Sequence, residues 1–502
     1  MKKWLRRIGK LCGWLLLILV FLLVEENIRG RILVATYKHH LRAQGEKLTL
    51  AELGLTNAPA PPDAATVDLL AAATQLPEWA GIRYAPETLR FMRPVISGTA
   101  TFSWAVPINE VWYDGKRYLT NRWPDVAAHL GSNAPALLSA ADALRRNPKG
   151  VTHDYRGAGD EASTSATQLL IKLRKWLMWA TANNLRERKL DQAGETILAL
   201  ARLGKTFQLS HPGYYRSFMQ YGLNATWELL QCAPTNSEQL TTLQNIWSDG
   251  SIVPIFPRFD EAYRAWNLQR IEAQHWGKHS DNSVAAQMYR LELENCSPAG
   301  AALWYLAGRH FDEYAYLMIF QTRLRLTRTV TESRCWSSWP GESWPKQILW
   351  CLPWAGELRF ALREHDIHEG MLRSVEFETQ REMTVAAIAL QRCRLRHGQW
   401  PETLNDMVPE FLAELPRDWM DGQPLRYRRN PNDTFILYSV GEDLRDDGGD
   451  LTPINNSNFD VYPLAMWRTR DAVWPVVATK ENIDELKKAA QDKKQPPPRN
   501  EW

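Results

Sequence analysis

The amino-acid sequence predicts a mainly α-helical protein. It has an N-terminal transmembrane helix, a helical-hairpin middle domain similar to tetratricopeptide repeats, and a small α+β module near the C-terminus. Three observations predict this fold class. A basic N-terminus precedes an apolar run, apolar residues recur at helical spacing through the middle, and short β-branched and aromatic runs flank turn residues elsewhere.

The N-terminal segment predicts a membrane anchor. Residues 11–24 form an uncharged apolar run, and five cations precede it: Lys2, Lys3, Arg6, Arg7 and Lys10. Counted from residue 8, the run is about 17 residues long, the lower limit for a helix that spans a bilayer. No small-residue cleavage motif follows, so we expect an uncleaved signal anchor, with a cleaved signal peptide as the alternative. Because cationic flanks stay in the cytoplasm, we expect the N-terminus inside and the rest of the chain outside.

Helical spacing continues beyond the anchor and dominates the middle of the chain. Apolar residues at 32, 33, 37 and 41 predict that the anchor helix continues as a stalk, which a proline-rich linker at 57–62 ends. Two apolar stripes within 165–209 predict a pair of helices joined by a tight turn, and such a hairpin must bury its stripes against neighbours. Further helices are predicted at 214–232, 237–247, 260–274, 284–294, 299–330 and 356–396.

Turn residues predict two β-hairpins. Asp114-Gly115 separates the short runs 111–113 and 117–119, and this dipeptide is a strong hairpin signal. An Asn-Pro-Asn-Asp turn at 430–433 separates 425–429 from 435–440. A long helix that ends at Gly398 precedes the second hairpin, and an acidic, glycine-rich loop at 441–450 follows it.

An ordered run of motifs follows the long helix. The run consists of RHGQWP at 396–401, TL at 403–404, LPRD at 415–418, GQPLRY at 422–427 and YSVGED at 438–443. With these motifs, residues 385–450 resemble the globular end of the major pseudopilin of type II secretion systems. A pseudopilin carries its membrane helix directly ahead of this module, whereas here a long helical region intervenes. The resemblance therefore implies a shared fold module and not a fibre subunit.

The whole chain also resembles a group of membrane-anchored bacterial proteins of unknown function. They share the anchor, the segment RAQGEK at 42–47, the helical middle and the C-terminal module. The resemblance implies a single-pass protein of the bacterial inner membrane with its main body in the periplasm, and it implies no activity. The predicted organisation is a cytoplasmic basic tail (1–10), a transmembrane signal anchor (11–30), a stalk and proline-rich linker (31–62), a mixed α/β region with short strands (63–160), a helical domain (161–365), the pseudopilin-like module (366–478) and a disordered basic tail (479–502).

The pseudopilin resemblance also implies calcium as a cofactor. Pseudopilins of this type hold Ca²⁺ in the loop after the last strand. By position, the ligands here would be a backbone oxygen of Ser439 and the carboxylates of Asp443, Asp447 and Asp450. A hard cation takes several oxygen ligands, which this loop offers, although its spacing is not that of an EF-hand. A solvated acidic turn is the alternative.

The segment EHDIHE at 364–369 is the densest other group of metal-ligating residues. On a helix, His365 and His368 lie on neighbouring turns, where they would share a zinc ion. The segment lacks the HExxH order that supplies two ligands and a base, so a polar helix face is the simpler interpretation. An ion-paired helix surface is likewise predicted for the carboxylates that follow: Glu376, Glu378 and Glu382.

Tryptophan is unusually frequent, with 23 residues against 16 Tyr and 14 Phe. Most recur on helical stripes or at turns and are predicted to pack in the core. Five crowd a proline-interrupted segment at 336–354, for which packing on the helical middle, a membrane-interface contact and a sugar-stacking platform are the alternatives. Cys335 and Cys351 in this segment either close a short disulfide loop or are buried thiols.

The charge balance indicates no nucleic-acid partner, since 60 Lys and Arg face 57 Asp and Glu. No small-molecule substrate is identified. We therefore expect a non-catalytic, membrane-anchored extracytoplasmic scaffold or protein-interaction protein, with envelope proteins as partners and a link to secretion or cell-envelope assembly. The alternative is an extracytoplasmic metal-dependent hydrolase of glycan or peptide that uses the 364–369 segment as its metal site.

Overall fold

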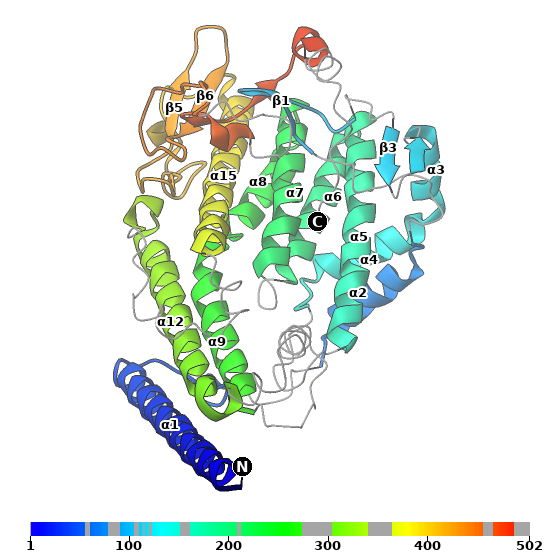
Figure 1. Ribbon diagram of the computed structural model, residues 1–502. Helices are drawn as coiled ribbons and strands as arrows, with labels where there is room; N and C mark the ends of the chain where they lie inside the picture. Colours follow the sequence, from blue (N-terminus) through cyan, green and yellow to red (C-terminus); the bar gives the residue numbers. More distant parts are fainter. Residues whose placement is uncertain are drawn as a thin grey trace.

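The computed structural model is mainly helical, as predicted, with small sheets at its periphery (Figure 1). It describes residues 2–55, 61–78, 91–104, 110–113, 116–119, 123–150, 161–207, 212–273, 304–339, 364–454 and 465–485. Several predictions lie wholly or partly outside these residues: the proline-rich linker, the helix at 284–294, most of the 336–354 segment and most of the tail from 479.

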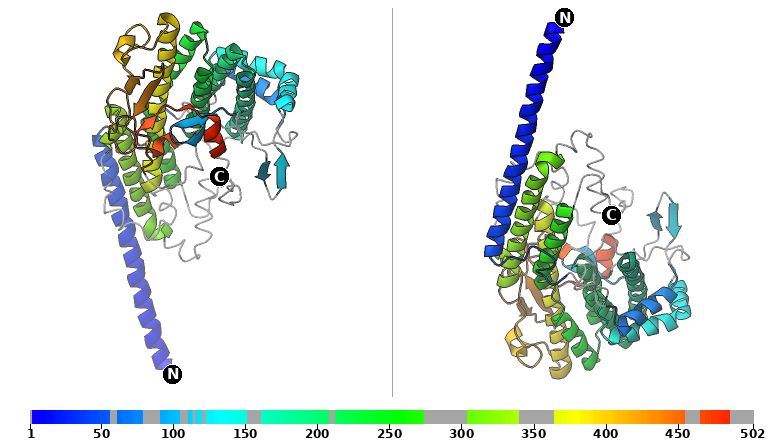
Figure 2. Two further views of the ribbon diagram at one scale, coloured as in Figure 1. Left: turned by 90° about the horizontal axis from the view of Figure 1, so that it is seen from above. Right: turned by 90° about the horizontal axis from the view of Figure 1, so that it is seen from below.

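The first helix, α1 (Lys2–Ala43), runs without a break from the predicted anchor into the predicted stalk. Large apolar side chains of its N-terminal half are exposed; Leu11 and Leu17 are each 61% exposed. Among the described residues, α1 is the one helix long and apolar enough to cross a membrane. Figure 2 shows its N-terminal part projecting well beyond the rest of the molecule.

The C-terminal half of α1 packs on α12 (Arg309–Ser333). Leu41, and Leu48 just beyond the helix, share a small core with Leu317 of α12 and Leu268 of α9 (Phe256–Ala273). Gly30 permits the close approach of the two helices, because a Cβ at this position would lie 2.9 Å from the Cβ of His310. The same helix is therefore exposed at one end and part of the folded body at the other.

A small mixed region follows the stalk. Its first helix begins after Asp63, whose carboxylate accepts a hydrogen bond from the Thr66 N–H at 3.0 Å and so caps the helix. The hairpin predicted at Asp114-Gly115 is confirmed by the antiparallel pairing of β3 with β4. The elements are α2 (Ala64–Gln75), β1 (Arg93–Ile96), β2 (Thr99–Thr101), β3 (Glu110–Tyr113), β4 (Lys116–Leu119), α3 (Trp123–Ser132) and α4 (Ala134–Arg145).

The middle of the chain is an array of helices that stand side by side (Figure 1). The predicted helical pair at 165–209 is observed as α5 and α6, and α6 also packs on α7. Its closer likeness to a tetratricopeptide repeat stays a prediction. The elements are α5 (Glu161–Arg186), α6 (Leu190–Lys205), α7 (Pro212–Gln231), α8 (Ser237–Ser248), η3 (Val253–Ile255), α9, η4 (Trp304–Gly308), α12 and η5 (Trp336–Ser338).

The C-terminal part consists of one long helix and short strands. The second predicted hairpin is confirmed, since β5 pairs antiparallel with β6, and β7 joins the other side of β6. The last strand, β8, pairs instead in parallel with β2, with Val476 opposite Thr99. The elements are α15 (Glu364–His397), η6 (Leu404–Met407), β5 (Arg426–Arg429), β6 (Phe435–Ser439), η7 (Ala465–Arg468), β7 (Ala472–Val473) and β8 (Val476–Val477). Residues 480–485 are helical.

One hydrophobic core joins the middle and C-terminal parts. It extends along the sequence from Leu69 to Trp474 and includes Phe377 and Ile388 of α15. Large side chains that are almost fully buried fill it, among them Trp176, Trp227, Trp247 and Trp467. For these residues the predicted packing role is confirmed. Because the core is shared, the sheet of β5, β6 and β7 is held on the helical array and not on a linker.

Candidate functional site

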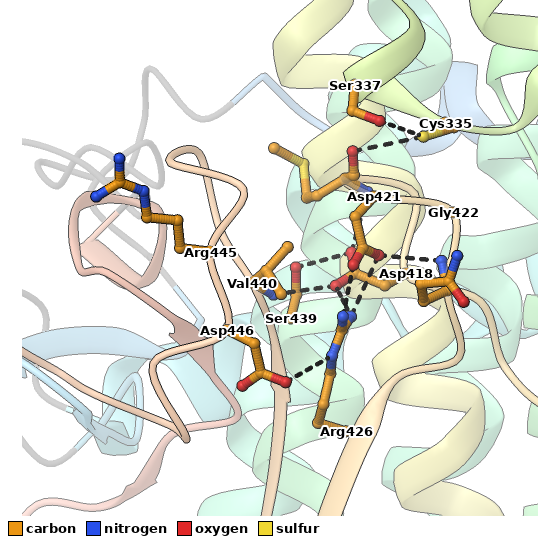
Figure 3. Close-up of polar contacts among 12 residues, drawn as sticks. Cys335, Ser337, Asp418, Asp421, Gly422, Arg426, Ser439, Val440, Arg445 and Asp446 are labelled. Atoms are coloured by element: carbon orange, nitrogen blue, oxygen red, sulfur yellow. Dashed lines mark hydrogen bonds and ion pairs between the residues drawn. The ribbon is translucent and has the colours of Figure 1, made fainter.

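A buried carboxylate, Asp418, lies at the centre of the polar contacts in the C-terminal part (Figure 3). Its Oδ1 accepts hydrogen bonds from Ser439 Oγ at 2.8 Å and from the Met420 N–H at 3.0 Å, and its Oδ2 accepts one from the Val440 N–H at 3.0 Å. Burial raises the pKa of Asp418 to about 6, and these hydrogen bonds oppose the rise. The carboxylate ties the loop before β5 to the end of β6.

Arg426, the first residue of β5, joins three carboxylates. Its guanidinium lies 2.9 Å from Asp418, 2.5 Å from Asp421 and 3.4 Å from Asp446. Asp446 belongs to the acidic loop, and Figure 3 shows it on the opposite side of the guanidinium from Asp418. One cation therefore neutralises three acids from two loops, which reduces the repulsion that they would otherwise exert on one another.

The start of the tryptophan-rich segment packs against this cluster. The Trp336 N–H donates to the Trp419 carbonyl at 2.7 Å, and the Ser337 N–H donates to the Met420 carbonyl at 3.0 Å. Cys335 carries a free thiol, with its Sγ 3.0 Å from Ser337 Oγ. For Trp336, which is buried, packing on the body is the observed role. Cys351 and the rest of the segment lie outside the described residues.

The acidic loop folds around a second buried carboxylate, Asp471. Its Oδ2 accepts hydrogen bonds from the N–H groups of Gly449 and Asp450, both at 2.8 Å. Burial raises the pKa of Asp471, although the backbone donors lower it again. Asp471 is not predictable from the sequence, because it lies beyond the loop and belongs to no local motif. It is the group that shapes the loop.

The three predicted carboxylate ligands lie on this loop and are engaged by other groups, whereas Ser439, whose backbone oxygen is the fourth predicted ligand, ends β6. Ser439 directs its hydroxyl to Asp418, and Asp443 accepts the Arg445 N–H at 3.0 Å. Asp450 Oδ1 accepts two hydrogen bonds from Thr452, and the Arg470 guanidinium lies 3.6 Å from Asp450 and 3.8 Å from Asp447. The donor set has the oxygen chemistry that calcium requires.

As they lie, however, these side chains do not form a cage for the ion. Within the described part of the chain, no group of three or more His, Cys, Asp or Glu side chains is placed to hold a metal. Arg470 supplies positive charge where a bound cation would neutralise Asp447 and Asp450. Calcium binding by this loop therefore stays a prediction that requires Arg470 to move or to be displaced.

The two predicted zinc ligands lie on the first turns of α15. The side chain of His365 is outside the described residues. The His368 ring packs edge-on against Trp336 and Trp339, with ring centroids 5.0 and 5.9 Å away. This aromatic contact is the neighbour of His368 that the structure describes. The zinc prediction remains untested.

The glutamates of α15 are ion-paired, as predicted, but the prediction of a helix surface is wrong. Glu376 and Glu378 are 2% and 0% exposed. Glu376 pairs with Arg373, and burial raises its pKa to about 8. Glu378 pairs with Arg381 at 2.8 Å and accepts a hydrogen bond from the Ile252 N–H. The reason is that α15 runs through the shared core, so its polar face is covered as well.

Comparison with known proteins supplies no relative. No family model, curated protein or solved structure matches the chain. The polar cluster around Asp418 and Arg426 is therefore interpreted from its contacts alone. Every member of the cluster is paired inside the protein. The cluster joins the loop before β5, the end of β6 and the acidic loop, so we interpret its role as structural. The other feature that bears on function is α1, whose apolar N-terminal half is exposed and whose C-terminal half packs on the body.

Proposed function

We propose that this protein is a single-pass membrane protein whose body acts outside the cytoplasm as a non-catalytic scaffold for other envelope proteins. The observation that carries the proposal is the continuity of α1. Its apolar N-terminal half has no cover, and its C-terminal half packs on α12. A helix of this kind holds the body at a fixed height and orientation next to a membrane.

Ion pairs at the base of α1 support a rigid attachment. Lys38 pairs with Glu313 of α12 and, at 2.5 Å, with Glu272 of α9. Just past the helix, Glu46 pairs with Arg264 of α9 at 3.0 Å and with Arg328 of α12. Buried charges that satisfy one another fix one geometry, because any shift leaves a charge unpaired. A flexible tether would not need these contacts.

The orientation follows from the cationic N-terminus, which favours the cytoplasmic side. Fusions of a periplasm-dependent reporter after residue 55 and after residue 485 should both be active in a bacterial host, and cytoplasm-dependent reporters there should be inactive. The protein should also stay in the membrane pellet at alkaline pH. Release from the pellet would contradict the anchor, and the opposite reporter pattern would contradict the extracytoplasmic body.

The scaffold role requires partners that the body itself binds. Full-length protein should be crosslinked in cells and purified under denaturing conditions, beside a control in which residues 1–30 carry an unrelated soluble domain. We expect envelope proteins that are crosslinked by the full chain and not by the control. Identical crosslinked proteins in both samples would contradict a scaffold role for the body and leave only the anchor.

A further inference from the structure

The middle of α1 contacts η4 at a defined level of the helix. The Asn27 side-chain amide donates a hydrogen bond to the Leu306 carbonyl at 2.7 Å. One turn further along α1, Gly30 lies against the side chains of His310 and Phe311, the residues that follow η4. These contacts join segments that are remote in sequence. They place η4 beside the residues of α1 that directly follow the apolar run.

This level corresponds to the surface of a bilayer. An α-helix rises about 1.5 Å per residue, so Asn27 lies about 5 Å beyond Val24, the last residue of the apolar run. A hydrocarbon core of about 30 Å needs about 20 helical residues, and counting from Lys10 puts its edge near residue 29. The headgroup layer adds about 6 Å on each side. By either count, Asn27 and Leu306 lie in or beside the headgroup layer.

The composition of η4 suits that environment. It begins Trp304-Tyr305-Leu306, and Trp and Tyr are enriched where proteins meet lipid headgroups. Leu306, the third residue of η4, is 48% exposed. On α1 itself, Ile28 is 53% exposed and Ile32 is 61% exposed, so apolar surface continues past the end of the run. Arg29 pairs with Glu26 at 3.2 Å, and 69% of its side chain remains exposed at the same level of the helix.

The Asn27 contact fits the same picture. The hydrocarbon core contains no water to hydrogen-bond polar groups, so a polar group that borders the core is stabilised by a partner inside the protein. The amide of Asn27 and the carbonyl of Leu306 satisfy each other. An asparagine within an anchor helix is costly in lipid unless such a partner is present.

We propose that η4 is a second membrane contact, which rests in the phospholipid headgroup layer beside the anchor and sets the height of the body. The inference rests on the proposed anchoring by α1. It holds whether the N-terminus of α1 is inside or outside the cell, because it depends only on which end of the apolar run faces the body. The partner that covers the exposed side chains of Leu306 and Ile28 is lipid.

The test uses the full chain reconstituted in vesicles of phosphatidylethanolamine and phosphatidylglycerol. A benzophenone-bearing amino acid is introduced at Leu306, at Leu17 within the apolar run, or at Leu138 on α4, and lipid adducts are counted by mass spectrometry after illumination. Leu138 is a matched control because it is 67% exposed and lies on α4, on the far side of the body from the free end of α1 (Figure 2).

We expect lipid adducts at Leu17 and Leu306, several-fold above those at Leu138. Adducts at Leu17 with none at Leu306 would overturn the second contact while the anchor stands. An absence of adducts at Leu17 would overturn the anchor and the second contact together. Equal yields of lipid adducts at Leu306 and Leu138 would also overturn the second contact, because the photoreaction would then depend on exposure of the side chain and not on its position in the bilayer.

Discussion

The carboxylate of Glu46 lies 3.0 Å from the guanidinium of Arg264, whose side chain is completely buried. Arg264 belongs to α9, whereas Glu46 follows α1, so this pair joins the C-terminal end of α1 to the body. Gln321 also hydrogen-bonds both residues. Removing one partner of a buried ion pair leaves an uncompensated charge, which costs more than the pair contributes.

Replacing this carboxylate should therefore loosen the anchor from the body. We expect Glu46→Gln to lower the free energy of unfolding by about 3 kcal/mol, since breaking buried pairs typically costs about 3–5 kcal/mol. The measurement is denaturant unfolding of the full chain in detergent. Glu195→Gln is the control, because its pair with Arg145 is half-exposed and 3.4 Å long and should contribute little. Equal effects of the two variants would contradict a special role for Glu46.

The close contact at Gly30 makes a second prediction. A Cβ at position 30 would lie 2.9 Å from the Cβ of His310, so Gly30→Val must push α1 away from α12. We expect a loss of roughly 1–3 kcal/mol, as for other overpacked contacts. Gly13→Val is the matched control on the same helix, since nothing lies within 4 Å of its added Cβ. Faster proteolysis between α1 and the body should be seen for Gly30→Val and not for Gly13→Val.

Glu228 should make stability depend on pH. It is fully buried on α7 and accepts hydrogen bonds from the N–H groups of Met92 and Ser103, and burial raises its pKa to about 8. The folded state then holds the proton more tightly than the unfolded state, whose pKa is near 4.5. Stability from this group is therefore present at low pH and falls as pH rises from about 4.5 to about 8.

The variant Glu228→Gln cannot ionise and should escape this loss. Its free energy of unfolding relative to wild type should increase between pH 5 and pH 8.5 by an amount on the order of 3 kcal/mol, since one pKa unit corresponds to about 1.4 kcal/mol. Denaturant unfolding at each pH measures this difference. Glu238→Gln, at an exposed position of α8, should show no such trend. A difference that stays constant with pH would show that Glu228 is ionised in the folded protein throughout.

Calcium binding by the acidic loop is tested through Arg470. Because its guanidinium lies near both Asp447 and Asp450, Arg470→Gln should free these carboxylates for a cation. At about 10 mM Ca²⁺, which exceeds the Kd of roughly 0.1–1 mM of weak extracellular sites, the variant should gain more in melting temperature than wild type. Adding Asp450→Asn should abolish the gain. No shift in any of the three proteins rules out the site.

Zinc is tested by metal analysis of protein purified without chelator. For a scaffold we expect less than stoichiometric zinc, and His368→Ala should mainly lower stability, since the ring packs on Trp336 and Trp339. Stoichiometric zinc that is lost in the double variant His365→Ala, His368→Ala would instead support a metal-dependent hydrolase.

Local signals predicted the elements of this fold well. The turn dipeptide Asp114-Gly115 and the turn at 430–433 each lie between strands that pair as expected. The continuation of the anchor helix to Ala43 follows from apolar spacing in the same way. In all three cases the interacting residues are near neighbours in sequence, so the pattern itself carries the information.

Contacts between distant segments could not be predicted in this way. Asp418 was visible as part of a motif, but its partners Ser439 and Val440 lie on another segment. Glu376 and Glu378 were assigned to a surface because charged residues are rarely buried, and only the course of α15 through the core explains why they are. The pairing of β8 with β2 has no local signal at all.

That last pairing has a consequence for how the chain is made. Thr99 of β2 is synthesised long before its partner Val476 of β8. At roughly 5–20 residues per second, ribosomes need on the order of 20–80 s to span this interval. During that time the edge of β2 that later pairs with β8 stays unpaired, whereas α1 has already been synthesised. Completion of the sheet is thus postponed until residues 476 and 477 have been synthesised, and a chain that stops short of residue 476 leaves β2 open to pairing with other chains.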